Sequence, residues 1–485
     1  MEAGLPADYP RLTRSNDARP GVGIVHLGLG AFFRAHGAIY IAEAMAASGG
    51  DWGITGVSLK RPDQRDRLAP QGCAYTALEL GPDGEHPRVI EVIENVLVAP
   101  EDPAAVVAAM AAPGVRIVSL TVTEKGYCHE PATGRLMRDH PDIKADLANP
   151  ERPSSAPGFI VRALAARRAA GLPPFTVMSC DNLPDNGHLL RGVVLDLAAL
   201  VDPGLAAWIE KEGSFPATMV DRIVPATKDE DLDRVAELTG RRDESPVLHE
   251  PFRQWVIEDD FVDGMRPDLG AVGVELVEDV APYEAMKLRC LNGTHSTLAY
   301  LGYLAGHETI AETVADEAFA LFVTRVWDEE IIPGLTPPPG VSLTDYSRAL
   351  LARYANPGIR HRTWQIAMDG SQKLPQRILT QLAEGLAAGR AMSGLTLAVA
   401  AWMRYVGGTD EKGAAIDVRD PMAERLKALS DAAPDPRGKA MALLGVAEVF
   451  PAELRDNADF RERLATAYAG LAEKGARAMV ESCHA

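Results

Sequence analysis

The chain of 485 residues has few cysteines, and they follow no pattern. The five stand at positions 73, 128, 180, 290 and 483, with no CxxC pair. An odd, scattered set argues against a disulfide framework and fits the reduced thiols of a cytoplasmic protein. The chain also lacks a run of about 18 apolar residues, the length that a membrane span needs. Its polar, proline-rich beginning lacks the apolar core of a signal peptide. We therefore expect a cytoplasmic protein without a membrane partner.

Positive charge is also scarce. There are 49 Lys and Arg residues against 68 Asp and Glu residues, which gives a formal net charge of −19. Neutralising nucleic-acid phosphates requires clustered Lys and Arg on a basic face, so we expect no nucleic-acid partner. Hydrophobic content of 47% is ordinary for a globular protein. The length exceeds one ordinary core and predicts at least two large domains.

The two parts of the chain differ in their predicted secondary structure. Short apolar runs that are typical of buried strands, at residues 22–27, 53–59, 115–122 and 175–179, alternate with helical patterns. This alternation predicts an α/β fold with a mostly parallel sheet. After about residue 282, long Ala/Leu-rich helical patterns dominate, among them residues 283–304 and 395–405. We predict a nucleotide-binding domain over residues 1–281 and a mostly α-helical domain over residues 282–485.

A glycine-rich turn follows the first predicted strand. Gly28 and Gly30 are succeeded by Ala31, Phe32, Phe33 and Arg34, where a helix is expected to begin. Such glycines let the backbone turn tightly and approach a pyrophosphate. The third glycine of the usual pattern is absent, because Phe33 stands there. The pattern alone also fits a plain strand-to-helix turn, and Arg34 fits either a phosphate contact or a solvated first-turn position.

The end of the second predicted strand bears on the choice of cofactor. An acid commonly binds the ribose hydroxyls there, but this chain has Lys60 and Arg61, with Asp63 just beyond. Cations at this place could accept a 2′-phosphate. The spacing leaves NAD and NADP both open.

Two further polar stretches lie at strand ends in this first part. Asn182, in the stretch Cys180-Asp181-Asn182, could donate a hydrogen bond to an alkoxide, or belong to a turn that caps the next helix. Asp221 and Arg222 interrupt an apolar, strand-like run. Charges there are costly unless they are paired, so a buried ion pair is one interpretation and a substrate or lysine contact by Asp221 is the other.

The most informative stretch is the beginning of the helical part. At about 100° per residue, Asn292 lies about 140° and His295 about 80° around an α-helix from Lys287. All three can project from one broad face, where an amine, an amide and an imidazole could hold a hydroxyl group and remove its proton. The alternative is a lysine on a solvated surface.

A second set of cations lies further along. Arg360, His361 and Arg362 precede Lys373 in a chain that is strongly negative overall. A local group of Arg, His and Lys suits an anionic ligand. The alternative is an ordinary exposed basic patch.

These residues together resemble the polyol-specific long-chain dehydrogenases, known as the mannitol dehydrogenase family. The matching segments are residues 24–36, 121–127, 180–182, 215–225 and the Lys-x4-Asn-x2-His pattern of residues 287–295. The missing third glycine is the family's own pattern. Residues 250–259 and 361–377 are similar to the branch of mannonate oxidoreductases, or fructuronate reductases. Gln365 stands where mannitol 2-dehydrogenases have an arginine, which argues against free mannitol as the main substrate.

The resemblance implies a Rossmann-type N-terminal domain and a role for each candidate residue. Lys287 would be the general acid/base, and Asn182 and Asn292 would stabilise the alkoxide. His295 would orient a substrate hydroxyl, and Glu124 would gate proton exit. The resemblance also implies that Asp221 and Lys373 bind further hydroxyls or the carboxylate. We add Arg360, Arg362 and Arg377 as candidates for the carboxylate, without support from the resemblance.

The function that we predict is NAD-dependent, metal-independent interconversion of D-mannonate and D-fructuronate, with NADP not excluded. The family implies a small-molecule sugar acid or polyol as partner, and a monomer or weak homo-oligomer. One alternative is a mannitol 2-dehydrogenase or related polyol dehydrogenase, acting on D-mannitol and D-fructose. Another, from a different class, is a catalytically inactive sensor of sugar acids.

Overall fold

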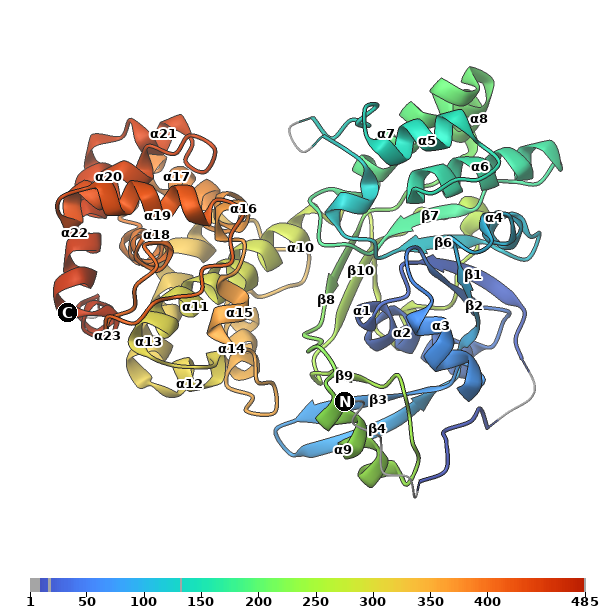
Figure 1. Ribbon diagram of the computed structural model, residues 1–485, viewed down its shortest axis with the longest axis horizontal. Coiled ribbons are helices and arrows are strands. Elements are labelled where there is room, and N and C mark those ends of the chain that lie inside the picture. Colours follow the sequence, from blue (N-terminus) through green and yellow to red (C-terminus); the bar gives the residue numbers. More distant parts are fainter. Residues whose placement is uncertain (1–8, 16–18, 131–132, 484–485) are drawn as a thin grey trace. The chain divides into compact units, whose positions relative to one another are not determined.

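The computed structural model describes residues 9–15, 19–130 and 133–483 (Figure 1). The chain divides into two compact units, Met1–Ala281 and Pro282–Ala485. Across the described residues, no helix combines the length and apolar character that crossing a bilayer requires.

The first unit is built on a five-stranded sheet in which all neighbouring strands are parallel. The strand order is β5 (Ile93–Val98), β2 (Gly53–Ser58), β1 (Val22–Leu27), β6 (Ile117–Leu120) and β7 (Thr176–Ser179). The chain builds outward from β1 in one direction and then returns to add β6 on its other side. The carboxyl ends of β1 and β6 therefore flank the point where strand order reverses, which is where such sheets bind ligands. The predicted α/β class is confirmed.

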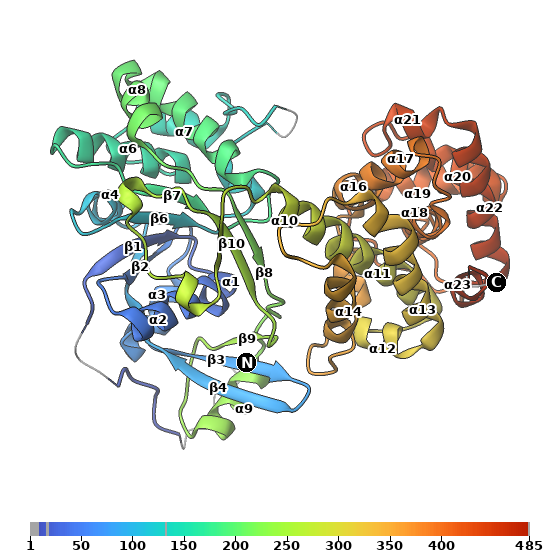
Figure 2. The same cartoon turned by 180° about the vertical axis from the view of Figure 1, so that it is seen from behind.

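Alternate residues of the strands enter two separate cores, because successive side chains point to opposite faces. Ile24, Ile54 and Ile117 pack beneath α1 (Ala31–Ala35), α2 (Gly37–Ser48) and α3 (Asp63–Leu68). Val25, Val57 and Val118 pack on the other face, which α4 (Pro103–Ala111), α6 (Ala156–Ala169) and α7 (Asn186–Val201) cover. Figures 1 and 2 show these two helical layers on either side of the sheet.

Two smaller three-stranded sheets complete the first unit. One has the order β11 (Glu275–Val277), β10 (Gln254–Glu258), β8 (Thr218–Asp221), and the other β4 (Gly84–Ile90), β3 (Tyr75–Gly81), β9 (Val247–His249). The remaining helices of the unit are α5 (Pro141–Ala148), α8 (Pro203–Glu212) and α9 (Asp229–Thr239).

The second unit is helical, as predicted. Helix α18 (Ser393–Val406) is buried along nearly its whole length, and α11 (Thr294–Ala305) and α22 (Ala458–Lys474) pack against it (Figure 1). The other helices are α10 (Ala281–Met286), α12 (Ile310–Ala315), α13 (Glu317–Arg325), α14 (Leu343–Tyr354), α15 (Thr363–Ala367), α16 (Gly370–Leu374), α17 (Thr380–Ala387), α19 (Ala423–Ala432), α20 (Pro436–Leu444), α21 (Ala452–Arg455) and α23 (Ala476–Ser482).

In the described part of this unit, residues 282–483, three turns are π-helical. They are η5 (Lys287–Gly293), η6 (Val326–Ile331) and η8 (Pro375–Leu379). The predicted regular helix over residues 283–304 is therefore a continuous run of α10, η5 and α11 with a wide turn in its middle. Because π-helical turns are rare and concentrate at functional sites, η5 is the most informative local feature of the unit.

Candidate active site

The position of Gly28, in the loop after β1, excludes any residue with a side chain. Its φ angle is +90°, and a Cβ placed on it would lie 2.2 Å from the carbonyl oxygen of Thr121. Its amide donates to the Val57 carbonyl at 2.9 Å, so the turn is held against the neighbouring strand. A side chain would break both the backbone conformation and this packing.

Gly30 and Phe33 show how the loop is built with two glycines in place of the usual three. Around the Cβ position of Gly30, which precedes α1, the single neighbour within 4 Å is the Gly28 carbonyl at 3.8 Å. The backbone there is open to a ligand. Phe33 fills the third position and stacks on the His26 ring, with centroids 3.4 Å apart. Gly37 then comes so close that its Cβ would lie 2.7 Å from the Phe33 ring. A side chain at Gly37 would therefore collide with the ring that fills the third position.

The loop rests on a buried, neutral histidine. The two ring nitrogens of His26 each lie 2.8 Å from a hydroxyl, those of Ser119 and Thr121. Burial lowers the pKa of His26 to about 3. Ala31 and Phe32, in the first turn of α1, are partly buried.

Arg34, for which a phosphate contact or a solvated position was expected, is buried and its guanidinium is engaged within the first unit. The phosphate contact stays a prediction. The side chain is buried, its guanidinium donates to the Ser245 carbonyl at 2.5 Å, and it lies over the Tyr75 ring. Burial lowers its pKa. A first-turn position suggested solvent exposure, but the β9 region covers this side of the helix.

Lys60 and Glu124 are both exposed in the first unit. Lys60 follows β2, where a dinucleotide's ribose is expected, and Glu124 begins the short helix η2 (Glu124–Tyr127) after β6. Neither position decides between NAD and NADP.

Asp181, beside the predicted Asn182, anchors the loop after β6. Its carboxylate accepts the amides of Val122 and Thr123 at 2.9 and 3.0 Å and the Tyr127 hydroxyl at 2.7 Å. Burial raises its pKa. Asn182 follows as an exposed residue on a fixed backbone at the carboxyl end of β7.

Asp221 is buried at the end of β8. Its neighbour Arg222 donates to the carbonyls of Ala35 and Glu250 at 2.7 and 3.0 Å and lies 3.8 Å from the Glu79 carboxylate. The charge of Arg222 is thus engaged with these groups.

In the second unit, η5 changes the geometry that an α-helix would give Lys287 and Asn292. In a π-helix the amide of residue i+5 bonds to the carbonyl of residue i, so the residue five positions on lies about one turn beyond, on nearly the same side. Asn292 is five positions after Lys287. The two side chains therefore align more closely than the 140° of an α-helix. Lys287 is buried, with 6% of its surface exposed. Arg289, the other cation of the turn, is bound to Glu384.

His295, in the first turn of α11, belongs to a buried group of rings. It stacks on Tyr354 with centroids 5.3 Å apart, and the His361 ring meets it edge-on at 4.7 Å. Burial, followed by the nearby His361, lowers the pKa of His295 well below its usual value, and burial lowers that of His361 to about 4. Both rings are neutral near pH 7. Among the described residues, neither His295 Nε2 nor His361 Nδ1 has a hydrogen-bond partner.

Two cations lie close to these rings. Lys373 Nζ donates to the carbonyls of Met368 and Ile366 at 2.5 and 3.4 Å, and Arg377 donates to the Ser296 hydroxyl at 3.1 Å. Burial, aided by the charge of Arg377, lowers the pKa of Lys373 to about 8. Burial also lowers the pKa of Arg377. Two partly desolvated cations and two neutral imidazoles form a site that favours an anion bearing hydroxyl groups.

Arg360 and Arg362 do not join this group. Arg360 is exposed and lies 3.7 Å from Glu308. Arg362 lines a separate cavity of about 380 Å³ with His307, Trp364 and Lys412. The backbone at Arg362 is extended and bridges to Thr309. Adjacent side chains of an extended segment point to opposite sides, so His361 faces His295 while the two arginines face away.

The sequence did not predict the part that three ring side chains play at this place. His361 was noted as a cation of the basic cluster, whereas it is a neutral ring against His295. Tyr354 and Trp327 are contributed by α14 and η6, and both contact η5. Their residue types alone gave no signal, because a Tyr or Trp in a helical pattern is ordinarily core.

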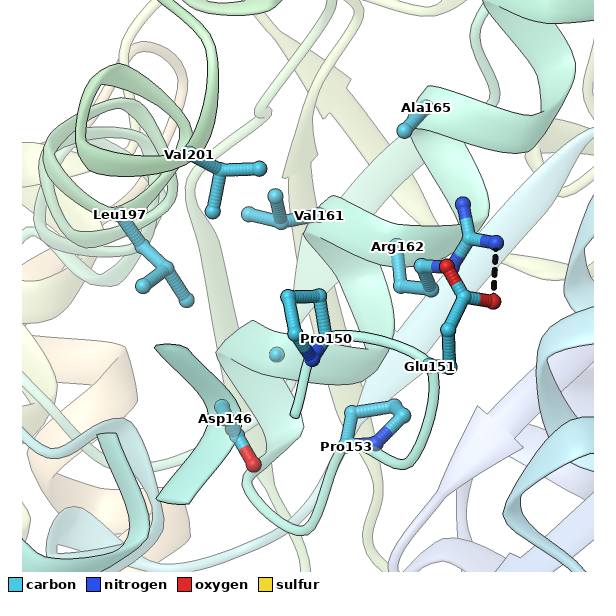
Figure 3. Close-up of a pocket in the computed structure, with 10 residues that line it drawn as sticks. Asp146, Pro150, Glu151, Pro153, Val161, Arg162, Ala165, Leu197 and Val201 are labelled. Atoms are coloured by element: carbon cyan, nitrogen blue, oxygen red, sulfur yellow. Dashed lines mark hydrogen bonds and ion pairs between the residues drawn. The ribbon is translucent and has the colours of Figure 1, made fainter. Parts of the chain in front are cut away.

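Two other places in the first unit have site-like features. Figure 3 shows a cavity of about 150 Å³ lined by Pro150, Val161, Leu197 and the Arg162–Glu151 ion pair. It holds no predicted site residue, and its Asp146 carboxylate is bound by Ser154 and Ser155.

Cys128, His140 and Asp142 bring three possible ligand atoms within 4.8 Å of one another. His140 Nδ1 already accepts the Asp142 amide at 3.2 Å, and burial raises the pKa of Cys128 to about 12. Both donors are therefore poorly prepared for a metal.

Family models match both units. The mannitol dehydrogenase Rossmann domain matches residues 22–270, and the mannitol dehydrogenase C-terminal domain matches residues 279–472. The chain belongs to the mannitol dehydrogenase family. The resemblance first seen in short segments is confirmed over both units, and the protein is an oxidoreductase of that family.

Individual relatives cover nearly the whole chain. It is 49% identical over 459 residues to the uncharacterized oxidoreductase YdfI of Escherichia coli, covering 94% of each chain. It is 48% identical over 485 residues to D-mannonate oxidoreductase of Escherichia coli, covering 99% of each. Pseudomonas fluorescens mannitol 2-dehydrogenase, solved as a ternary complex with NAD and D-mannitol, matches with a TM-score of 0.85 and 39% identity, over 99% of this chain and 97% of that one.

Proposed function

We propose that this member of the mannitol dehydrogenase family interconverts D-mannonate and D-fructuronate with NAD(H). The observation that carries the choice of a sugar acid is the pair of partly desolvated cations, Lys373 and Arg377, beside two neutral imidazoles. A neutral polyol has no group that would offset the cost of desolvating two cations, whereas a carboxylate does. The full-length likeness to a D-mannonate oxidoreductase supports the same choice.

The first unit fits a dinucleotide. The Gly28 turn is fixed by its neighbours, and the backbone at Gly30 is open to a pyrophosphate. Gly28, Gly30, Ala31, Phe32 and Phe33 would hold it, with Lys60 near the ribose and Glu124 at the edge. A bound nicotinamide supplies or accepts the hydride. The relative solved with NAD supports NAD over NADP.

Proton transfer is assigned to Lys287. Its Nζ would take the proton from the substrate hydroxyl during oxidation and return it during ketone reduction. The Asn292 amide, aligned with it by the π-helical turn, would donate to the oxygen as negative charge develops there, and Asn182 is proposed for the same task. These donors take the role that an oxyanion hole has in acyl transfer.

Substrate orientation is assigned to the His295 imidazole and to the cations Lys373 and Arg377. His295 is neutral, so its imidazole can donate to or accept from a hydroxyl. Lys373 and Arg377 would bind the carboxylate, and Asp221 is proposed for a further hydroxyl. Arg360 and Arg362 are left out of this assignment because Arg360 is exposed beside Glu308 and Arg362 lines another cavity.

A substrate panel tests the proposal. NADH oxidation is measured with D-fructuronate, D-tagaturonate and D-fructose, and repeated with NADPH. The highest kcat/KM is expected with D-fructuronate and NADH. A clear preference for D-fructose would establish the rival polyol dehydrogenase, which the 39% identical mannitol 2-dehydrogenase favours. Absence of turnover with every ketose would favour the sugar-acid sensor.

A further inference from the structure

The π-helical turn η5 is held open by side chains from outside it. The indole of Trp327 donates to the Cys290 carbonyl at 2.9 Å, and the Tyr354 hydroxyl donates to the Leu291 carbonyl at 2.8 Å. Thr294 Oγ1 also donates to the Cys290 carbonyl, at 2.5 Å. All of these groups are buried. Two successive carbonyls, lying between Lys287 and Asn292 in the chain, thus accept bonds from side chains on three separate elements.

These bonds matter because a π-helical turn does not sustain itself. Isolated π-helical turns within α-helices are rare, and side chains that insert into the backbone hydrogen-bond ladder distort helices locally. Without the outside donors, both buried carbonyls would lose side-chain partners, although the Leu291 carbonyl would keep the Thr294 amide, and the turn could tighten toward an α-helix. Tightening would rotate Asn292 away from Lys287.

Tyr354 has a second contact in the same place. Its ring stacks on His295 at an interplanar angle of 17°, and its hydroxyl lies 3.0 Å from Thr294 Oγ1. One side chain, at the end of α14, therefore contacts both the turn that carries Lys287 and Asn292 and the ring that is assigned to a substrate hydroxyl.

We propose that Tyr354 is a positioning residue of the reaction, which keeps Lys287, Asn292 and His295 in register through the π-helical turn, with Trp327 in a supporting role. The inference rests on the proposed roles of those three residues. It assigns to Tyr354 no proton transfer and no contact with substrate. An error of about 1 Å in the placement of a catalytic group can cost about 100-fold in rate, so a loss of this bond should appear in turnover.

The test is Tyr354→Phe in the full-length protein, because it removes the hydroxyl and keeps the stacked ring. We expect kcat for reduction of the best panel ketose to fall about 10- to 100-fold. KM and the NADH dissociation constant should stay within about twofold, because the cations and the first unit are untouched. The primary isotope effect with deuterated NADH should rise as chemistry becomes slower.

Tyr405→Phe is the matched control. Tyr405 is a buried tyrosine of the same unit, and its hydroxyl has no hydrogen-bond partner among the described residues. Its removal should leave kcat and the isotope effect unchanged. Trp327→Phe, which removes the donor to Cys290, should repeat the kcat loss in weaker form and provides a second variant if Tyr354→Phe fails to fold.

The outcomes separate the two proposals. If the wild-type protein reduces a ketose and Tyr354→Phe keeps kcat within twofold, the positioning role is overturned while the proposed function stands. Equal losses in Tyr354→Phe and Tyr405→Phe would overturn it too, because they would show a general effect on the core. If the wild type reduces no ketose, both proposals fall together.

Discussion

Lys287 is the residue on which the proposed chemistry depends. Replacing it with alanine removes the group to which proton exchange is assigned, but leaves the glycine-rich loop of the first unit intact. We expect Lys287→Ala to lower kcat by about 10²–10⁴, the range that general acid–base groups contribute. NADH affinity, followed by its fluorescence, should not change. The exposed Lys474 offers a control, since Lys474→Ala should be fully active. More than about a tenth of wild-type turnover in Lys287→Ala would contradict the role.

Lys373 gives the reaction a pH dependence of known sign. Its pKa is lowered to about 8, so its charge is present below that pH and disappears as the pH rises through it. If the charge binds a carboxylate, kcat/KM for D-fructuronate should fall by up to about tenfold per pH unit above about 8. The same quantity for neutral D-fructose should fall less, which separates Lys373 from any titration of Lys287.

A matched variant checks that assignment. Lys373→Met keeps much of the length of the side chain but cannot titrate. Its kcat/KM for D-fructuronate should be low at every pH, and the ratio of the rates with D-fructuronate and D-fructose should no longer vary with pH. If that ratio still falls above pH 8 in Lys373→Met, another group binds the carboxylate.

At the scale of helices and strands, the sequence predicts what depends on local pattern. β1 begins and ends where the apolar run 22–27 does, because a buried parallel strand needs an unbroken apolar segment. The helix expected to begin at Arg34 is interrupted at His36, whose ring lies 2.9 Å from the Gln254 carbonyl. That interruption depends on a residue far along the chain, so a local pattern cannot reveal it.

The same limit explains the candidate site. The Lys-x4-Asn-x2-His spacing is visible in the sequence, but the π-helical turn that aligns its members is not. The turn depends on Trp327 and Tyr354, which lie on separate elements later in the chain. Likewise, Arg360 and Arg362 share a basic stretch with His361, and only the extended backbone at that place shows that they face the other way.

The packing of η5 against η8 gives a prediction at this scale. A Cβ on Gly293 would lie 2.8 Å from the Arg377 carbonyl and 3.0 Å from Gln381 Nε2, so the two π-helical turns must separate to admit it. We expect Gly293→Ala to destabilise the protein by about 1–3 kcal/mol, the usual cost of overpacking, and to lower kcat by shifting Asn292. Thermal unfolding and steady-state kinetics measure the two effects.

Gly192 provides the opposite case for comparison. It lies within α7, and nothing approaches its Cβ position within 4 Å. Gly192→Ala should therefore stabilise the protein by about 0.5–1 kcal/mol, because alanine is the better helix former. If Gly293→Ala is as stable and active as the wild type, close packing of the two turns does not set the site.

Across the whole molecule, the negative net charge contrasts with one local pair of cations. The net formal charge is −19, yet Lys373 and Arg377 lie in one partly buried place, where within the described part of the chain their side chains donate to carbonyl and hydroxyl oxygens and not to a carboxylate. An anionic substrate must therefore be recognised by specific contacts, since the net field of the protein repels it. In the proposed function, cofactor binding belongs to the first unit and carboxylate binding to the second.

This division predicts that the two binding steps can be impaired separately. Arg377→Met should raise KM for D-fructuronate about 10- to 100-fold, the value of a hydrogen bond to a charged group, and leave the NADH dissociation constant unchanged. Gly28→Ala should weaken NADH binding at least tenfold, because its Cβ would strike the Thr121 carbonyl and distort the turn. Gly49→Ala controls for backbone strain alone, since Gly49 also has a positive φ but nothing within 4 Å. Fluorescence titration gives the NADH dissociation constant of the three variants, and steady-state kinetics give their KM for D-fructuronate. If Arg377→Met weakens NADH binding as much as Gly28→Ala does, the two tasks are not divided between the units, and the assignment of Arg377 to the carboxylate fails with it.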